Sequence, residues 1–394
     1  MGLNETHSSD RVHIGFFGKR NAGKSSVVNA VTGQNLSVVS DVLGTTTDPV
    51  YKAMELLPMG PVMIIDTPGI DDVGELGKMR IEKTEQVLNK IDIAVLVVDA
   101  VCGISEEDEE LIKEFKNREI NYVVVFNKSD LKTVQVSDNE ILVSAQTGDN
   151  INELKEKIAS LSKKDTKENR IIGDLINKGD FVLLITPIDE AAPKGRLILP
   201  QQQTLREVLD ADAYAIVVKE NGIKEAIEKH RPSLVVCDSQ VFDIANREVP
   251  DEVRLTSFSI LMARYKGNLL NAVKGASELD KLCDGDTVLI SEGCTHHRQC
   301  NDIGTVKLPK LIKKYTNKEI NFEFTSGGDF PRDLSKYKMI VHCGGCMLNE
   351  NEMKYRYRTA NENAIPITNY GIAIAYMNGI IKRSISVFKE LEDV

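Results

Sequence analysis

Thiol and imidazole side chains gather in two short stretches toward the C-terminal end of the chain. The stretches are SEGCTHHRQC (residues 291–300) and VHCGGC (residues 341–346), and each begins where an apolar run ends. Thiols and imidazoles at such spacings bind metal ions, form a redox dithiol or lie together by chance. If the two apolar runs are parallel strands, Cys294 and Cys343 lie at the same edge of a sheet, where α/β folds place their ligands.

Spacing alone leaves four interpretations of these residues open. The cysteines can be incidental thiols near a turn. Cys343 and Cys346 can form a redox dithiol, which leaves Cys294 and His296 unexplained. Three cysteines and a histidine also form an ordinary structural zinc site. The fourth interpretation is a [4Fe–4S] cluster that is held by three thiolates and has an exchangeable fourth ligand.

A second chemical site is indicated by the sequence GKRNAGKS (residues 18–25). The apolar run before it and the helical stretch after it are the context of a phosphate-binding loop. Backbone N–H groups of such a loop wrap the phosphates, Lys24 neutralises charge on the β- and γ-phosphates, and Ser25 binds Mg²⁺. The contacts expected from this loop are Gly18, Asn21, Ala22, Gly23, Lys24, Ser25 and Ser26.

Later motifs specify guanine as the base. In DTPG (residues 66–69), Asp66 can hold Mg²⁺ through water, and Gly69 can offer its N–H to the γ-phosphate. In NKSD (residues 127–130), the Asp130 carboxylate can accept two bonds from guanine, which adenine cannot supply together. The dipeptide SA (residues 144–145) can reach the guanine O6, and GTTTD (residues 44–48) lies where a phosphate-sensing switch belongs. The further contacts expected here are Gly44, Thr45, Thr46, Thr67, Pro68, Asn127, Lys128, Ser144 and Ala145.

Strands that alternate with helices must position these motifs. Amphipathic stretches separate the apolar runs VHIGFF (12–17), VMIID (62–66), IAVLVVDA (93–100), YVVVFNKSD (122–130) and EILVSA (140–145). This alternation predicts a mostly parallel α/β sheet. A charged run at residues 163–170 predicts a linker, after which the pattern restarts. We therefore expect an α/β chain with a P-loop GTPase domain at residues 1–165, followed by two smaller α/β domains at residues 172–262 and 265–394.

Composition limits the classes of partner. The net charge of −10 over 394 residues argues against general binding to nucleic acid or to an anionic membrane. No apolar signal segment opens the sequence, so a cytoplasmic location and reduced thiols are expected. The apolar stretch at residues 364–381 contains two asparagines and predicts a strand followed by a buried helix, with no membrane span.

The nucleotide motifs resemble the TrmE–Era branch of GTPases. Ile70 follows DTPG where Ras-type enzymes place a catalytic Gln, so another group must neutralise charge in the transition state. In this branch, Asn at the fourth loop position together with a G-T-T switch marks potassium-activated enzymes, and Asn21 and Gly44–Thr45–Thr46 match. The resemblance implies catalytic roles for Lys24, Asn21 and Thr46, with Thr46 as a second Mg²⁺ ligand beside Ser25. It also implies K⁺ ligands at Asn21, Ser40, Val42 and Thr45.

The pairing of such a GTPase with this cysteine–histidine pattern resembles the HydF family, the GTPases among the three maturation proteins of [FeFe]-hydrogenase. The matching residues are Cys294–Thr295–His296 and His342–Cys343–Gly344–Gly345–Cys346. The resemblance implies a [4Fe–4S] cluster on Cys294, Cys343 and Cys346. The fourth position is labile, and its candidate ligands are His296 and His342, with Cys300 and Asn301 also within reach.

The same resemblance implies a scaffold. It would receive a transient diiron precursor from two radical-SAM maturases and pass it to immature [FeFe]-hydrogenase. By analogy, the middle domain is expected to form a homodimer. The alternative is a ribosome- or RNA-associated GTPase with a zinc-binding C-terminal domain, for which KLPKLIKKY (residues 307–315) is the one short basic helix.

Overall fold

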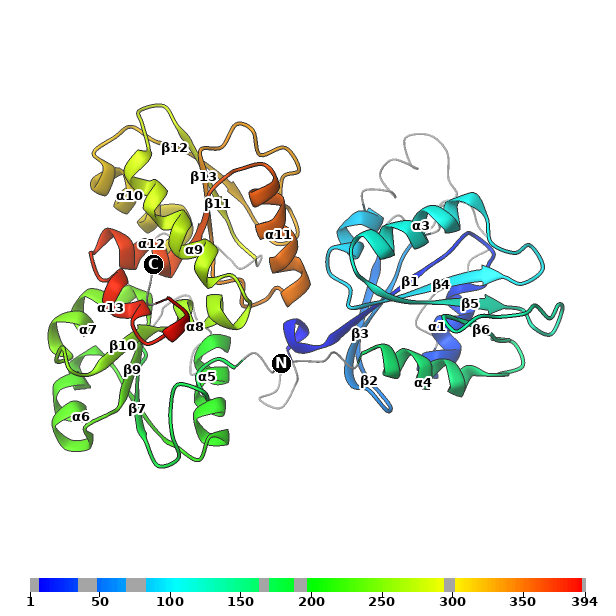
Figure 1. Cartoon of the computed structure of the whole chain (residues 1–394), viewed down its shortest axis with the longest axis horizontal. Coiled ribbons are helices and arrows are strands. Elements are labelled where there is room, and N and C mark those ends of the chain that lie inside the picture. Colours follow the sequence, from blue (N-terminus) through cyan, green and yellow to red (C-terminus); the bar gives the residue numbers. More distant parts are fainter. Residues whose placement is uncertain are drawn as a thin grey trace. The chain divides into compact units, whose positions relative to one another are not determined.

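Three sheets make up the fold, one in the unit of residues 1–166 and two in the unit of residues 167–394. The computed structural model describes residues 7–34, 48–68, 83–162, 170–187, 197–293 and 302–391. Figure 1 shows α/β architecture in both units, with helices packed on the sheets.

The N-terminal unit is built on a six-stranded sheet in the order β2-β3-β1-β4-β5-β6. Every neighbouring pair is parallel except β2 and β3, which are antiparallel. Its strands are β1 (Val12–Phe17), β2 (Val50–Leu56), β3 (Gly60–Asp66), β4 (Ile93–Asp99), β5 (Asn121–Asn127) and β6 (Glu140–Leu142). The predicted parallel arrangement is confirmed, whereas β2 was not predicted, because its side chains are mostly exposed and form no apolar run.

Helices cover both faces of this sheet. Along β4, Val95 and Val97 pack in a core with α1 (Lys24–Thr32) and α4 (Ile151–Leu161). The alternate residues of the same strand, Leu96 and Val98, pack with α3 (Glu106–Asn117) on the other face. This alternation makes the strand apolar throughout, which is why the sequence shows continuous apolar runs.

Two four-stranded parallel sheets form the second unit, in the orders β10-β9-β7-β8 and β12-β11-β13-β14. The first contains β7 (Phe181–Ile185), β8 (Tyr214–Val218), β9 (Leu234–Cys237) and β10 (Arg254–Ser257), with helices α5 (Leu199–Asp210), α6 (Ile223–His230), α7 (Phe242–Glu248) and α8 (Phe258–Tyr265). The second contains β11 (Thr287–Ser291), β12 (Asn321–Thr325), β13 (Met339–His342) and β14 (Ile367–Asn369). Its helices are α9 (Leu269–Ala276), α10 (Leu308–Thr316), α11 (Glu350–Glu362), α12 (Tyr370–Met377) and α13 (Ile381–Ile385).

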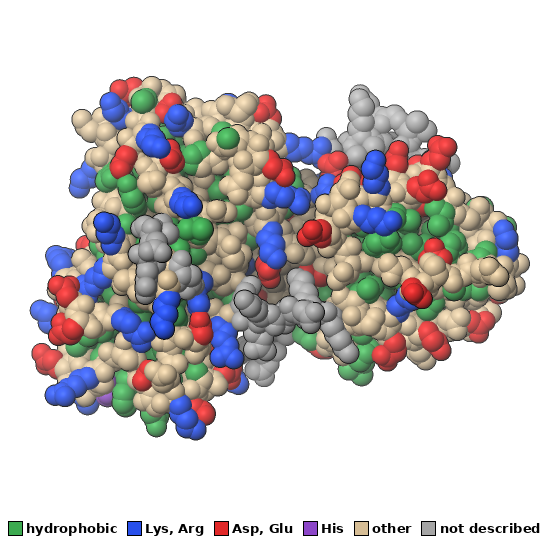
Figure 2. Space-filling model, in the orientation of Figure 1, with side chains coloured by type: hydrophobic (Ala, Val, Ile, Leu, Met, Phe, Trp, Pro, Cys, Tyr) green, Lys and Arg blue, Asp and Glu red, His purple; other side chains and the backbone are tan. Residues whose placement is uncertain are grey.

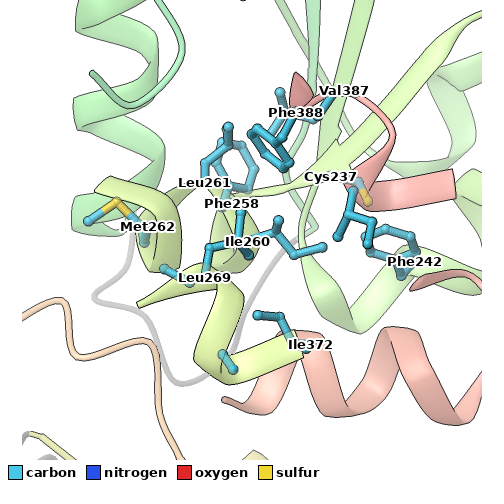
Figure 3. Packing of buried hydrophobic residues seen from close by; sticks show 14 of the residues in the cluster. Cys237, Phe242, Phe258, Ile260, Leu261, Met262, Leu269, Ile372, Val387 and Phe388 are labelled. Carbon is cyan, nitrogen blue, oxygen red and sulfur yellow. The ribbon is translucent and has the colours of Figure 1, made fainter. Parts of the chain in front are cut away.

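The two sheets of the second unit share one hydrophobic core. Phe258 and Leu261 of α8 lie in the same cluster as Val387 and Phe388 near the chain end (Figure 3). Arg383 of α13 also donates to the main-chain oxygens of α7 and the turn after it, at 3.0 and 2.9 Å. Sequence alone treats these sheets as two domains. In the structure, the two predicted smaller α/β regions share this core within one compact unit of residues 167–394.

The stretch at residues 364–381 folds as predicted, into β14 followed by the buried helix α12. Within the described residues, none of the helices is both long enough and apolar enough to cross a membrane. On the face drawn in Figure 2, Lys and Arg side chains lie among Asp and Glu side chains on each unit.

Candidate functional site

The phosphate-binding loop runs from the end of β1 to the start of α1, and two of its glycines are required by close contacts. Gly18 has a φ of 146°, and a Cβ there would lie 2.3 Å from the carbonyl oxygen of Val97. Gly23 has a φ of 85°, and a Cβ there would lie 2.2 Å from Nδ2 of Asn127. The two glycines therefore let the loop lie close against β4 and β5.

Lys24 and Asp66 meet at the carboxyl ends of β1 and β3, where Phe16 and Asp66 are register partners. Lys24 Nζ forms an ion pair with Asp66 Oδ1, and Ser25 Oγ lies 3.5 Å from Asp66 Oδ2. The Lys24 and Asp66 side chains are only 11% and 12% exposed. The structure thus brings the predicted phosphate cation and two predicted magnesium ligands together.

Thr67 fixes the DTP segment to β1. Its Oγ1 donates to the carbonyl oxygen of Phe16 at 2.7 Å, and its N–H donates to the same oxygen at 3.2 Å. Thr67 is buried, and Pro68 follows it. These bonds position the neighbouring Asp66. The predicted contact residue Ser26 is exposed in the first turn of α1.

The base-reading motifs are tied to the phosphate-binding loop through Asn127. Asn127 Nδ2 donates to the carbonyl oxygen of Ala22 at 3.1 Å, and Asn127 Oδ1 accepts from the N–H of Ala145 at 3.1 Å. Ser144 Oγ donates to Asp130 Oδ1 at 2.6 Å, which orients an exposed carboxylate. These bonds join the three predicted motifs into one site.

Lys128 is held by Asp99 at the end of β4. Its Nζ donates to Asp99 Oδ2 at 2.6 Å, and the N–H of Val101 donates to Asp99 Oδ1 at 2.8 Å. Burial opposes ionisation of Asp99, but these hydrogen bonds outweigh it and hold the pKa of its carboxyl below the ordinary value. The sequence does not single out Asp99, although it is the one charged residue in the apolar run at residues 93–100.

Several predicted site residues lie outside the described part of the chain. They are Ser40, Val42, Gly44, Thr45, Thr46, Gly69, Cys294, His296, Cys300 and Asn301.

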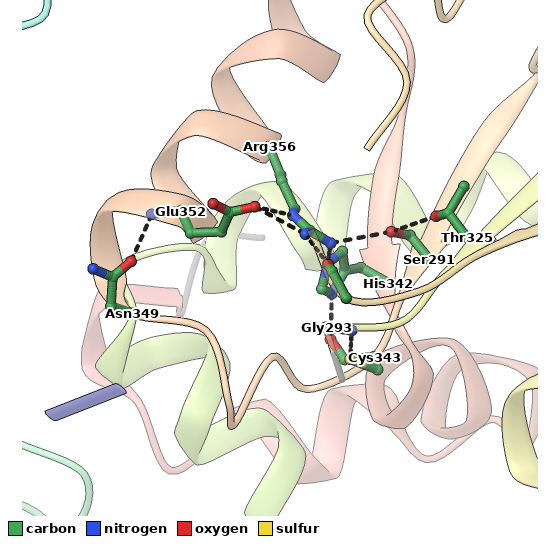
Figure 4. Close-up of polar contacts among 9 residues, drawn as sticks. Ser291, Gly293, Thr325, His342, Cys343, Asn349, Glu352 and Arg356 are labelled. Atoms are coloured by element: carbon green, nitrogen blue, oxygen red, sulfur yellow. Dashed lines mark hydrogen bonds and ion pairs between the residues drawn. The ribbon is translucent and has the colours of Figure 1, made fainter. Parts of the chain in front are cut away.

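The thiol stretches meet because β11 and β13 are parallel neighbours, with Ser291 opposite His342. The Sγ atom of Cys343 accepts from the N–H of Gly293 at 3.0 Å and from the N–H of Gly345 at 3.3 Å. Figure 4 shows the contact from Gly293, the residue directly before Cys294 in the sequence. The prediction that the two stretches share a sheet edge is therefore confirmed for the described residues, which end at Gly293 in the first stretch.

His342 is fully buried, and both of its ring nitrogens are engaged. Arg356 Nη1 lies 2.9 Å from His342 Nε2, and His342 Nδ1 lies 2.7 Å from the carbonyl oxygen of Cys343. Because a guanidinium can only donate, Nε2 accepts and Nδ1 carries the proton. Burial, and then the Arg356 charge, lower the pKa of His342 to about 3, so the ring is neutral.

Arg356 lies at the centre of a buried polar network that the sequence analysis missed (Figure 4). It donates to Glu352 Oε1 at 2.9 and 3.1 Å, to Ser291 Oγ at 3.3 Å and to the carbonyl oxygen of Gly327 at 2.6 Å. Glu352 and Arg356 are four residues apart on α11, the helix that follows HCGGC. Opposite charges at this spacing on a helix are the sequence feature that indicates their ion pair.

Two more buried charged residues border the thiols. Lys266 Nζ donates to the carbonyl oxygens of Gly345, at 2.7 Å, and Leu348. Glu292 is buried two residues before Cys294, and Tyr370 donates to its Oε1 at 3.4 Å. Its carboxylate oxygens can coordinate a metal ion at this end of the sheet.

Cys343 and Cys346 are the thiol donors that the structure describes here, and neither is in a disulfide. Burial raises the pKa of Cys343 to about 11 and also raises that of Cys346. A metal ion must therefore displace the thiol protons, as it does in thiolate sites. Thiols that accept N–H bonds at a strand end are a donor set that suits zinc or an iron–sulfur cluster. Within the described residues, His, Cys, Asp and Glu form no group of three or more that could hold a metal ion.

The glycine-rich loop, the Lys24–Asp66 pair and the base-reading residues define the class of the chain as a P-loop GTPase. Residues 13–128 match the family model described as a 50S ribosome-binding GTPase. Residues 171–267 match the hydrogen maturase F dimerization domain, and residues 270–387 match the hydrogen maturase F tetramerization domain. The chain belongs to the hydrogen maturase F family, HydF, so the resemblance stated from the sequence is confirmed.

Two curated GTPases each match part of the chain. The chain is 35% identical over 185 residues to GTPase Der of Wolinella succinogenes, covering 42% of this chain and 39% of that protein. It is 35% identical over 162 residues to the tRNA modification GTPase MnmE of Clostridioides difficile, covering 39% of this chain and 35% of that protein. The chain therefore spans well under half the length of these relatives.

Among solved structures, Era of Aquifex aeolicus bound to GDP and aluminium fluoride matches with a TM-score of 0.35 and 20% identity. The match covers 55% of this chain and 97% of that chain.

Proposed function

We propose that the chain is a GTP-hydrolysing scaffold that binds a [4Fe–4S] cluster and carries a diiron precursor to immature [FeFe]-hydrogenase. The observation that carries this proposal is the presence, in one chain, of a GTPase site and of a half-buried turn with two thiols, and this turn lies within the hydrogen maturase F domains. The ribosome- or RNA-associated alternative is not favoured, because residues 171–387 fall almost entirely in those two domains.

Cys294, Cys343 and Cys346 would hold the cluster. When bound, the cluster supplies an iron with a replaceable ligand, to which the diiron cargo can attach and from which it can leave. The N–H groups of Gly293 and Gly345 stabilise the Cys343 thiolate. Because both ring nitrogens of His342 are engaged, we assign His342 to hold Arg356. His296, Cys300 and Asn301 remain candidates for the fourth position, and the buried Glu292 carboxylate is a further one.

In the GTPase unit, we assign to the side chains the roles that the sequence motifs predict. Lys24 would bind the β- and γ-phosphates, Asp130 would accept from the guanine base, and Ser25, Thr46 and Asp66 would hold Mg²⁺. Asn21, Ser40, Val42 and Thr45 would hold K⁺, whose charge replaces that of a catalytic side chain. Of these K⁺ ligands, the structure describes Asn21, which is exposed with a φ of 64° at the tip of the phosphate-binding loop.

GTP hydrolysis is expected to be faster in K⁺ than in Na⁺, by about tenfold, because one added charge contact near the transferring phosphate lowers the barrier by roughly 1.4 kcal/mol. Steady-state phosphate release in matched chloride salts measures this ratio. Asn21→Ala should abolish the difference between the salts. Equal parent rates in K⁺ and Na⁺ would refute the potassium site while leaving the GTPase assignment intact.

We propose a homodimer formed mainly through residues 172–262. Strand β8 is an edge strand, yet it exposes apolar side chains: Tyr214 is 58% exposed and Val217 is 43% exposed. The Tyr214 ring stacks on Phe181 with centroids 5.0 Å apart. An exposed apolar edge strand is an energetic liability in a monomer and pairs readily with another chain.

Val217→Lys is expected to weaken dimerisation by about 30-fold, the effect of losing one interface contact of roughly 2 kcal/mol. Sedimentation over a range of concentrations gives the dissociation constant. Val136→Lys, at a similarly exposed valine in the GTPase unit, serves as the control and should sediment like the parent. A parent chain that sediments as a monomer would contradict the proposal.

Delivery is tested with the full chain purified anaerobically from cells that also express the two radical-SAM maturases. Mixed with immature [FeFe]-hydrogenase, this protein should produce hydrogen evolution, whereas Cys343→Ala prepared in the same way should produce none. Equal activation by chain made without the maturases would contradict the carrier role.

A further inference from the structure

Asp99 is the last residue of β4, and it lies beside the start of the base-reading motif NKSD at the end of β5. The two strands are parallel neighbours, and Asp99 is the register partner of Asn127 (Figure 1). The N–H of Ala100 donates to the carbonyl oxygen of Asn127 at 2.9 Å, which keeps the two strand ends together. Asp99 therefore lies at the edge of the sheet where α/β folds place their ligands, although it belongs to none of the predicted nucleotide motifs.

The Asp99 carboxylate is held at both of its oxygens. Lys128 Nζ donates to Oδ2 at 2.6 Å, and the side chains of Lys128 and Asp99 are only 31% and 18% exposed. The N–H of Val101 donates to Oδ1 at 2.8 Å. A charge-assisted hydrogen bond to a carboxylate that the main chain also fixes is strong and well directed, so the Lys128 ammonium has a set position.

A second lysine ties the base-reading loop to the turn between β4 and α3. Lys132 Nζ donates to the carbonyl oxygen of Val101 at 3.0 Å. The N–H of Gly103 donates to the carbonyl oxygen of Asp99 at 2.8 Å, which closes this turn. Lys128 and Lys132 thus both contact the turn that Asp99 begins.

Lys128 has a backbone conformation that a lysine rarely adopts. Its φ is 71°, in the left-handed region that favours glycine. Residues in this region persist where the surrounding structure holds them, and they cluster at ligand sites. Lys128 lies two positions before Asp130, so its conformation sets the direction in which the loop turns towards that carboxylate. The ion pair with Asp99 is the side-chain contact that holds Lys128 in this conformation.

Resting on the proposed contact of Asp130 with guanine, we propose that Asp99 is a positioning residue of the nucleotide site, which fixes the base-reading loop through Lys128. A loop that is fixed before the nucleotide arrives loses less conformational entropy on binding, so the affinity rises. GTP and GDP carry the same base, and the bond that breaks lies between the β- and γ-phosphates. The gain therefore applies equally to substrate and product and leaves the chemical step unchanged.

The test measures GDP binding by titration calorimetry and steady-state GTP hydrolysis on the full chain, with thermal unfolding recorded for each variant. Asp99→Asn keeps the shape of the side chain but removes the charge, and Lys128→Met removes the ammonium. A double variant carries both changes. Asp138→Asn, at an exposed aspartate of the same unit, is the control for loss of one negative charge.

Asp99→Asn is expected to weaken GDP binding and to raise the KM for GTP about tenfold, the effect of losing one hydrogen bond to a charged group, with kcat unchanged. Asp138→Asn should match the parent. Because Asp99 acts through Lys128, the double variant should bind GDP no more weakly than Lys128→Met alone. Parent-like GDP affinity in a folded Asp99→Asn variant, or a further loss of about tenfold in the double variant, overturns the inference.

If Asp99→Asn does not fold, Lys128→Arg, which keeps a charged donor, is compared with Lys128→Met. Lys128→Arg is expected to bind GDP about tenfold more tightly than Lys128→Met, and equal affinities overturn the inference. A parent chain that binds ADP as tightly as GDP overturns the assigned guanine site itself, and this inference with it.

Discussion

Replacing Lys24 with alanine is expected to lower the rate of GTP hydrolysis by about 10²–10³-fold, the usual loss when one charged or polar group that stabilises the transition state is removed. Lys24 is the first residue of α1 and forms an ion pair with Asp66, a predicted magnesium ligand. Phosphate release at saturating GTP, compared with that of the parent, measures the effect.

The same change removes one ion-pair partner of the nearly buried Asp66, so thermal unfolding is recorded for each protein. Lys113→Ala, at an exposed lysine on α3, is the matched control and should keep the parent rate. A folded Lys24→Ala variant that hydrolyses GTP within a few-fold of the parent would contradict the assigned site.

Replacing Cys343 with alanine is expected to abolish the [4Fe–4S] signal while GTP hydrolysis stays within twofold of the parent rate. The thiol accepts two N–H bonds between the ends of β11 and β13, so its loss removes a ligand that no described neighbour replaces. Hydrolysis persists because all the nucleotide motifs lie in a separate compact unit with its own cores.

Cys283→Ala, at an exposed cysteine of the same unit, is the control and should keep the cluster. Iron content, sulfide content and EPR spectra after anaerobic reconstitution are compared for the two variants. Full iron content in Cys343→Ala would contradict the ligand assignment, and loss of hydrolysis in the same variant would contradict the independence of the two units.

Much of the GTPase site could be predicted from sequence because its motifs are local and each follows an apolar strand. Parallel strands bring their carboxyl ends to one edge, so the order of the motifs implied their meeting. The bonds from Asn127 to Ala22 and Ala145 show that meeting directly. Strand β2 could not be predicted from the sequence, because its side chains form no apolar run and it is defined by its pairing with β3.

The surroundings of the thiols could not be predicted in the same way. Lys266 and Gly345 are 79 positions apart, and nothing in the local sequence around either residue signals their contact. His342 was a candidate ligand because it adjoins Cys343, but the structure shows that Arg356 occupies its Nε2. The shared core of the two small sheets likewise depends on the chain end packing back onto α8, a long-range contact.

Anaerobic reconstitution of the parent chain, followed by metal analysis and EPR of the dithionite-reduced protein, tests the central claim most directly. We expect about four irons and four sulfides per chain, with the spectrum of a reduced [4Fe–4S] centre. Stoichiometric zinc without iron in the purified protein would contradict it.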